Sequence, residues 1–93
     1  MITAIVLMNV RRGQVNAVAE KLTEIYGVSE VYSVGGRYDL VVMVRTATNE
    51  ELAYVVTNHM QAIDAIEHTE TLIAFRAFSH HDLEAMFSVG LAE

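Results

Sequence analysis

Hydrophobic and polar positions recur along this chain with two periods, and each period predicts one kind of element. Short apolar runs predict four strands, at residues 2–10, 28–34, 38–46 and 69–78. Helical spacing predicts a helix over residues 13–26, with Gly27 at the position of a C-cap glycine. A capping box, Thr48 to Glu51, starts a second helix that runs to Ile63. A similar box at Ser79 predicts a short C-terminal helix.

This order of elements is β-α-β-β-α-β followed by one helix, which predicts a ferredoxin-like α+β sandwich. Two helices would cover one face of a four-stranded antiparallel sheet. The chain contains no proline and no low-complexity stretch that would mark a linker. We therefore expect a single domain over residues 1–93, with its core at 2–78 and the C-terminal helix at 79–90.

The strands do not alternate between apolar and polar residues, as a sheet with one wet face should. Ile5 and Leu7 oppose Val6 and Met8 in the first strand, and the third strand is apolar on both sides as well. An uncovered second face would exceed the apolar patch usual for a monomer. We therefore expect a homodimer packed sheet against sheet, in the manner of a dimeric α/β-barrel. The alternative is that the C-terminal helix folds back over its own sheet.

Composition narrows the possible functions. Hydrophobic residues make up 53% of the 93 residues, above the ~45–50% usual for soluble domains. The net charge is −6, and the six basic residues form no cluster, which argues against direct nucleic-acid binding. No apolar run is long enough to span a membrane. With no cysteine and no targeting segment, we expect a cytoplasmic protein.

The segment VYSVGGRYDLVVMV combines two glycines with a carboxylate at the mouth of an apolar strand. Gly35 and Gly36 permit positive φ and leave backbone N–H groups open to close approach, and they are also a hairpin signal. Asp39 beside such amides would suit a zwitterion, whose carboxylate takes the amides and whose ammonium takes Asp39. Ordinary turn chemistry, with Asp39 accepting bonds from its own hairpin, is the alternative. Spacing alone leaves both interpretations open.

The same segment resembles the ligand-binding module, or RAM domain, of the Lrp/AsnC family, whose turn Gly-x-Tyr-Asp leads into an apolar strand. Gly36, Tyr38 and Asp39 match that turn. The stretch AIEHTETLIAF is similar to the family's segment before the last strand, with Thr69 and Thr71 at its two threonines and Ala65 in place of the usual glycine. The resemblance covers residues 2–78.

The resemblance implies an amino-acid effector bound between dimers that assemble into octamers or other rings. It makes Gly35, Gly36, Tyr38 and Asp39 the candidate ligand contacts, with Thr69 and Thr71 as further candidates. Family members also carry a DNA-binding helix-turn-helix, whereas this chain starts on the first strand. We therefore expect an effector module without its own DNA-binding domain, which could act on full-length regulators of the family. The C-terminal helix would dock on a neighbouring subunit or on its own sheet.

Three other functions fit parts of the sequence. A small dimeric α/β-barrel enzyme, of monooxygenase or isomerase type, has the same element order, and Asn9 and His59 could line its pocket. The sequence shows no nucleophile–base pair or phosphate loop, so we expect no enzyme activity and no cofactor. His80 and His81 would diverge on a helix, so no metal site is expected. A pure assembly protein would use Asp39 only as a turn residue.

Overall fold

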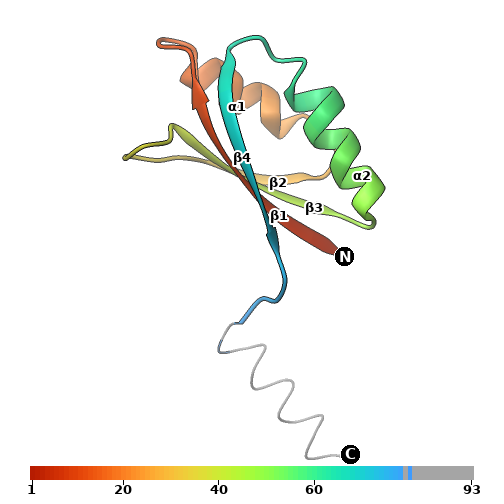
Figure 1. Cartoon of the computed structure of the whole chain (residues 1–93). Helices are drawn as coiled ribbons and strands as arrows, with labels where there is room; N and C mark the ends of the chain where they lie inside the picture. The colour runs from red at the N-terminus through yellow and green to blue at the C-terminus, as the bar shows by residue number, and fades with distance from the viewer. Residues whose placement is uncertain (79, 81–93) are drawn as a thin grey trace, which may run out of the picture.

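The structure is a computed structural model that describes residues 1–78 and 80. Its elements, in chain order, are β1 (Ile2–Val10), α1 (Val15–Thr23), β2 (Val28–Ser33), β3 (Leu40–Thr46), α2 (Asn49–Tyr54), the π-helical segment η1 (Val55–Met60) and β4 (Ile66–Ala74). The strands form one antiparallel sheet in the order β2-β3-β1-β4. Both helices lie on one side of it (Figure 1). This is the predicted ferredoxin-like arrangement. The C-terminal helix predicted at 79–90 lies outside the described residues apart from His80.

The core lies between the sheet and the helices. Alternate residues of β1 and β3 are buried there, as the period of a strand requires. They are Ala4, Val6, Met8, Val10, Leu40, Val42 and Val44. Val18 and Leu22 pack down from α1, and Leu52 from α2. The predicted division of these two strands into an inner and an outer face is confirmed.

The second helix changes geometry after Tyr54, where a single α-helix was predicted. Val55 and Met60 are both buried, at 4% and 1% exposure. In an α-helix of 3.6 residues per turn, residues five apart differ by about 140° in direction. Bonds from i to i+5 instead bring such residues onto one side. The π-helical segment therefore lets both side chains face the core.

Both predicted ends of β4 and the predicted C-cap of α1 were wrong. β4 begins at Ile66 rather than Thr69, and it ends at Ala74 rather than Phe78. Its last partner is Thr3, close to the start of β1, so the later residues have no strand to pair with. At the end of α1, Glu24 is the C-cap rather than Gly27. Gly27 adopts a φ of 97° in the turn that leads into β2.

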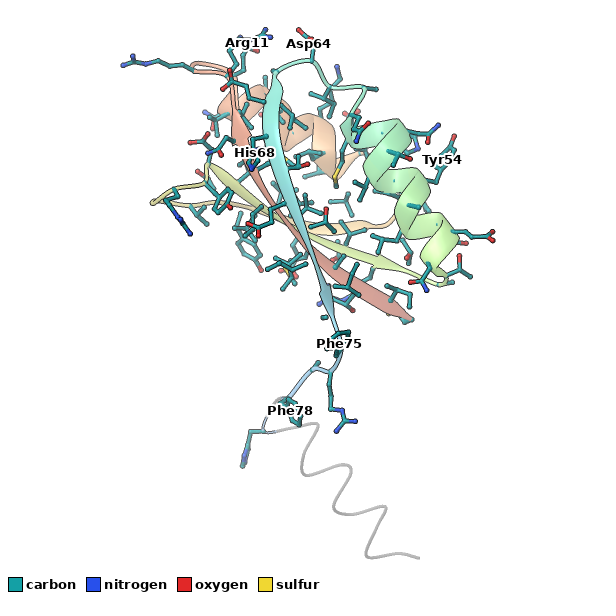
Figure 2. All side chains as sticks on the ribbon, viewed as in Figure 1. Arg11, Tyr54, Asp64, His68, Phe75 and Phe78 are labelled. Atoms are coloured by element: carbon teal, nitrogen blue, oxygen red, sulfur yellow. The ribbon has the colours of Figure 1, made fainter. Side chains whose placement is uncertain are left out.

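The other side of the sheet, here called the outer face, carries no helix among the described residues (Figure 1). Strand register places its apolar side chains together. They are Ile5, Leu7, Tyr32, Val41, Met43 and Leu72. Beyond β4 the chain leaves the sheet, and Phe75 and Phe78 lie away from the body of the domain (Figure 2). Phe75 is fully exposed and lies one residue beyond the end of β4, whereas the sequence had predicted that it lies within the last strand.

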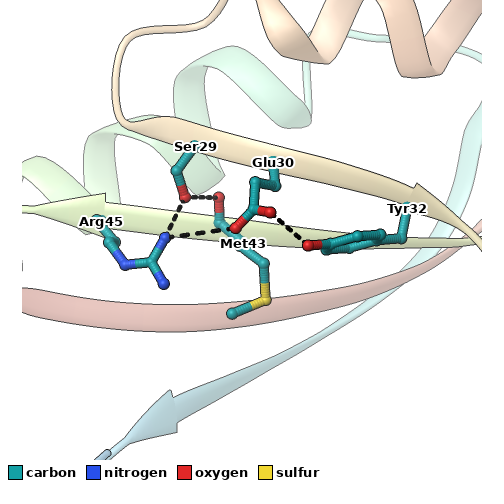
Figure 3. Close-up of polar contacts among 5 residues, drawn as sticks. All are labelled: Ser29, Glu30, Tyr32, Met43 and Arg45. Carbon is teal, nitrogen blue, oxygen red and sulfur yellow. Dashed lines mark hydrogen bonds and ion pairs between the residues drawn. The ribbon is translucent and has the colours of Figure 1, made fainter. Parts of the chain in front are cut away.

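A polar network borders the outer face along β2 (Figure 3). The Tyr32 hydroxyl donates a hydrogen bond to Glu30, and Arg45 Nη1 lies 3.8 Å from the same carboxylate. Arg45 also donates to Ser29 Oγ at 2.6 Å, and Ser29 donates to the Met43 carbonyl at 3.1 Å. Ser29 sits where the β2–β3 register shifts. The outer face is therefore an apolar patch with a polar rim.

Candidate functional site

β2 and β3 form the antiparallel hairpin that the two glycines predicted. The segment that links them, residues 34–39, is six residues long, whereas the predicted strands left only residues 35–37 between them. The Val34 N–H donates to the Asp39 carbonyl at 3.1 Å and closes the loop. Gly36 has a φ of 121°, which disfavours any residue with a side chain. Gly35 is not among the residues with positive φ. The backbone conformation therefore requires a glycine at position 36 but not at position 35.

Asp39 fixes this loop to the end of β1. Its Oδ2 accepts a hydrogen bond from the Val10 N–H at 2.9 Å, and its own N–H donates to the Met8 carbonyl at 2.9 Å. Asn9 Nδ2 donates to the Arg37 carbonyl at 2.7 Å. Val10 lies at the irregularity where the pairing of β1 with β4 shifts register. The Asp39 carboxylate thus accepts a hydrogen bond from the neighbouring strand β1, whereas the alternative interpretation had it accept bonds from its own hairpin.

Tyr38 reaches from the loop to the edge strand β4. Its hydroxyl donates a hydrogen bond to Glu70 Oε2. This bond to a carboxylate raises the pKa of the Tyr38 hydroxyl above its ordinary value. Glu70 pairs with Leu7 across the β1–β4 ladder, so its side chain lies on the outer face. The two sequence segments that carry the family resemblance therefore meet in space through Tyr38 and Glu70.

Thr69 and Thr71 flank Glu70 but lie on the other face. They pair with the buried residues Met8 and Val6 and so share the helical side of the sheet. Thr69 lines a hollow of about 230 Å³ between η1 and β4, with Val56, Met60, Gln61, Ile66, Glu67 and His68. Gly35, Gly36, Tyr38 and Asp39 belong to one loop, whereas the two threonines are separated from it by the plane of the sheet.

Two residues of this region were not identified from the sequence as candidate contacts. Glu70 stands between the two threonines, and strand alternation places it with His68 and Leu72 on the opposite face. The available signal was the position of this carboxylate, two residues before the apolar Leu72 in the same strand. Asn9 was predicted only as an enzyme candidate, and its bond to the loop links segments 28 residues apart.

The residues suggested for the enzyme alternative lie on different layers. Asn9 pairs with His68 on the outer face. His59 is exposed on η1, where its ring makes an edge contact with Tyr54. The hollows that His59 lines do not include Asn9. Of the His80-His81-Asp82 segment only His80 is described. Within the described chain, no helix is long and apolar enough to cross a membrane.

Comparison with known proteins agrees with this geometry. The family model of the Lrp/AsnC ligand binding domain matches residues 3–83. The HTH-type transcriptional regulator FL11 of Pyrococcus furiosus is 36% identical over 75 residues, which are 81% of this chain and 49% of the regulator. The chain thus spans about half the length of that relative.

Solved structures show the same fold. TTHA0845 from Thermus thermophilus is 49% identical with a TM-score of 0.81, over 86% of this chain and all of that one. A feast or famine regulatory protein from M. tuberculosis, complexed with L-methionine, is 22% identical with a TM-score of 0.68, over 85% of this chain and 53% of that one. At that identity the likeness concerns the fold. The family match, the relative and the fold together confirm the resemblance seen in the sequence, and the chain belongs to the family of Lrp/AsnC ligand-binding domains.

Proposed function

We propose that this protein is an effector and oligomerisation module that binds a free amino acid through the 34–39 loop. The observation that carries the proposal is the double attachment of this loop, by Asp39 to Val10 and by Tyr38 to Glu70. The attachments hold a carboxylate beside exposed glycine backbone, where an α-ammonium and an α-carboxylate could both find partners. The L-methionine complex of a structural relative supports an amino acid as the ligand class.

The proposed contacts are Gly35, Gly36, Tyr38 and Asp39, with Thr69 and Thr71 joining from the edge strand. Asp39 Oδ2 is engaged by Val10, so the ammonium would take the second carboxylate oxygen. The threonines lie across the sheet from Tyr38 in one chain. A ligand that touches both groups would therefore have to sit at the β4 edge, where a neighbouring subunit could complete the site.

We also propose that two chains pair through the outer face and that such dimers assemble into an octamer or another ring. The apolar side chains of the outer face and its polar rim support this pairing, because an apolar centre with a polar border is the usual anatomy of an interface. Full-length regulators of the family are further proposed partners. We assign the module no catalysis, no cofactor and no direct nucleic-acid contact, and we place it in the cytoplasm, since its relatives are transcriptional regulators.

The test is a thermal-shift screen against the twenty amino acids at fixed protein concentration. A ligand at 100 times its Kd adds about 2.7 kcal/mol, and each kcal/mol moves the midpoint by roughly 4–8 °C in a domain of this size. The discriminating variant is Asp39→Asn, which keeps an oxygen for the Val10 N–H but removes the charge. Its matched control is Glu20→Gln, which removes an exposed carboxylate from α1.

We expect a shift with a few related amino acids in the wild type and in Glu20→Gln, and a much smaller one in Asp39→Asn. No shift with any amino acid in the wild type would refute the effector function. An undiminished shift in Asp39→Asn would instead refute only the assigned role of Asp39.

A further inference from the structure

A second surface feature lies on the helical side of the molecule, away from both the 34–39 loop and the outer face. It is a hollow of about 380 Å³, here called the tyrosine hollow, lined by Tyr26, Glu50, Glu51, Tyr54, Val55 and His59. A larger hollow of about 510 Å³ adjoins it, because Tyr26 and His59 line both. Together they form a groove that runs from α2 to the end of α1.

The π-helical segment shapes one wall of this groove. Tyr54 and His59 are five residues apart, and on a regular α-helix they would point about 140° apart. Here their ring centroids are 5.2 Å apart with the planes at 75°. Figure 2 shows Tyr54 on the side of α2 that faces away from the strands. The change of helical geometry that buries Val55 and Met60 therefore also places two rings in one wall.

The two tyrosine rings of the tyrosine hollow are exposed to water. Tyr26 is 84% exposed and Tyr54 56% exposed, although both are large side chains. Pairing through the outer face would leave the helical layer free, so the proposed dimer does not cover them. Tyrosine is enriched at protein interfaces, because its ring is apolar and its hydroxyl can hydrogen-bond.

The charged side chains around the two tyrosine rings indicate which kind of ligand would bind there. No lysine or arginine lines the tyrosine hollow, while two carboxylates do. Glu51 already accepts a hydrogen bond from the N–H of Ala47, the residue before the N-cap Thr48. Glu50 takes part in none of the ion pairs formed within the described residues. The neighbouring hollow adds Glu24 together with Lys21. A carboxylate beside aromatic faces favours a cation, because the ring quadrupole and the charge attract it together.

We infer that the tyrosine hollow binds a basic side chain, a lysine or an arginine, presented by an extended segment of a partner protein. The groove continues past His59 towards Ile25 and Ile63, which gives room for the residues that flank the basic one. The acidic rim and the net charge of −6 complement a basic segment. The inference does not depend on the proposed effector site, which uses other residues on another part of the domain.

The probe is the blocked tripeptide acetyl-Gly-Lys-Gly-amide, titrated at pH 8, above the range in which histidines usually titrate. The readout is the aromatic NMR resonances of Tyr26, Tyr54 and His59. The same peptide with norleucine in place of lysine is the neutral control. We expect saturable shifts of the three rings with the lysine peptide and no saturable shifts with the norleucine peptide.

Two variants test the chemistry. Tyr54→Ala and Glu50→Gln should each weaken binding by about two- to fivefold, the size expected of a cation–π contact or an ion pair at an exposed site. Glu20→Gln removes an exposed carboxylate from α1 outside the groove and should change nothing. Urea midpoints of the variants, unchanged from the wild type, would show that the fold is kept.

Three results would overturn the inference. The rings could fail to respond to the lysine peptide, or they could respond equally to the norleucine peptide, which would make the groove simply apolar. They could also shift with protein concentration alone, which would make a second copy of this chain the occupant. Asp39→Asn, which should weaken amino-acid binding at the 34–39 loop, should leave the titration with the lysine peptide unchanged. Failure of the effector proposal is therefore distinguishable from failure of the tyrosine-hollow proposal.

Discussion

The Tyr38 hydroxyl donates a hydrogen bond to the Glu70 carboxylate, and this bond joins two segments that are 32 residues apart in the sequence. One segment is the loop that resembles the effector-binding turn of the family, and the other is the stretch that contains Thr69 and Thr71. The bond crosses the outer face near Leu7, which pairs with Glu70. A substitution at Glu70 should therefore change the environment of the Tyr38 hydroxyl, and a substitution at Tyr38 that of the Glu70 carboxylate.

The titration of Tyr38 provides a direct test of this bond. Its pKa is raised chiefly by the hydrogen bond to Glu70, and the pKa of Tyr32 is raised in the same way by Glu30. A raised pKa means that the bond stabilises the fold fully below the unfolded-state pKa of about 10 and loses this effect as the pH rises through the raised value. Absorbance at the tyrosinate band should show that two tyrosines of the wild type lose their protons at a pH above the ordinary tyrosine pKa.

Glu70→Gln should move one of these two transitions to lower pH, because the acceptor is then neutral. Glu30→Gln is the matched variant and should move the other, and the double variant should move both. If Glu70→Gln leaves the alkaline titration curve unchanged, the Tyr38–Glu70 bond is absent in solution.

Replacing Asp39 tests how the loop is attached. Asp39→Ala leaves the partly buried Val10 N–H without its acceptor, which should cost about 1–2 kcal/mol of unfolding free energy. Asp39→Asn keeps an oxygen at that place and should lose less. Urea denaturation of the three proteins measures the difference. Equal midpoints for Asp39→Ala and the wild type would contradict the structural role.

Gly36 and Gly35 form a matched pair in the same loop. A Cβ at either position would meet no atom within 4 Å, so steric crowding cannot make an alanine at one position cost more than at the other. The φ of 121° at Gly36 makes an alanine strained there, at a cost of about 1–3 kcal/mol. Gly35→Ala should be neutral or slightly stabilising, since it lowers the entropy of the unfolded chain. Thermal or urea midpoints compare the two, and an equal loss at both would disprove the conformational argument.

A charge on the outer face should break the proposed dimer. Val41 lies there opposite Leu7 and Tyr32, and Val41→Glu would bury a carboxylate among apolar side chains. An uncompensated buried charge costs several kcal/mol, so self-association should weaken by about a hundredfold or more. Ala53→Glu, on the exposed side of α2, is the control and should not change the assembly. Sedimentation velocity reports the mass, and an unchanged mass for Val41→Glu would exclude the outer face as the interface.

The amino-acid sequence by itself determined the element order, the ferredoxin-like arrangement and the two faces of β1 and β3. These features follow from local periods of two and 3.6 residues, which depend on neighbours in the chain. The sequence also indicated the loop at Gly36, Tyr38 and Asp39, because a short motif carries the family resemblance.

Only the tertiary structure decided where β4 ends, which residues hold the loop and which candidates share a surface. β4 ends where β1 no longer offers a partner, and the loop is held by Asn9 and Val10, about thirty residues earlier in the chain. Thr69 and Thr71 proved to lie across the sheet from Tyr38, while Glu70 between them meets it. Contacts of this kind depend on the register between strands, and a local pattern does not specify a register between segments so far apart.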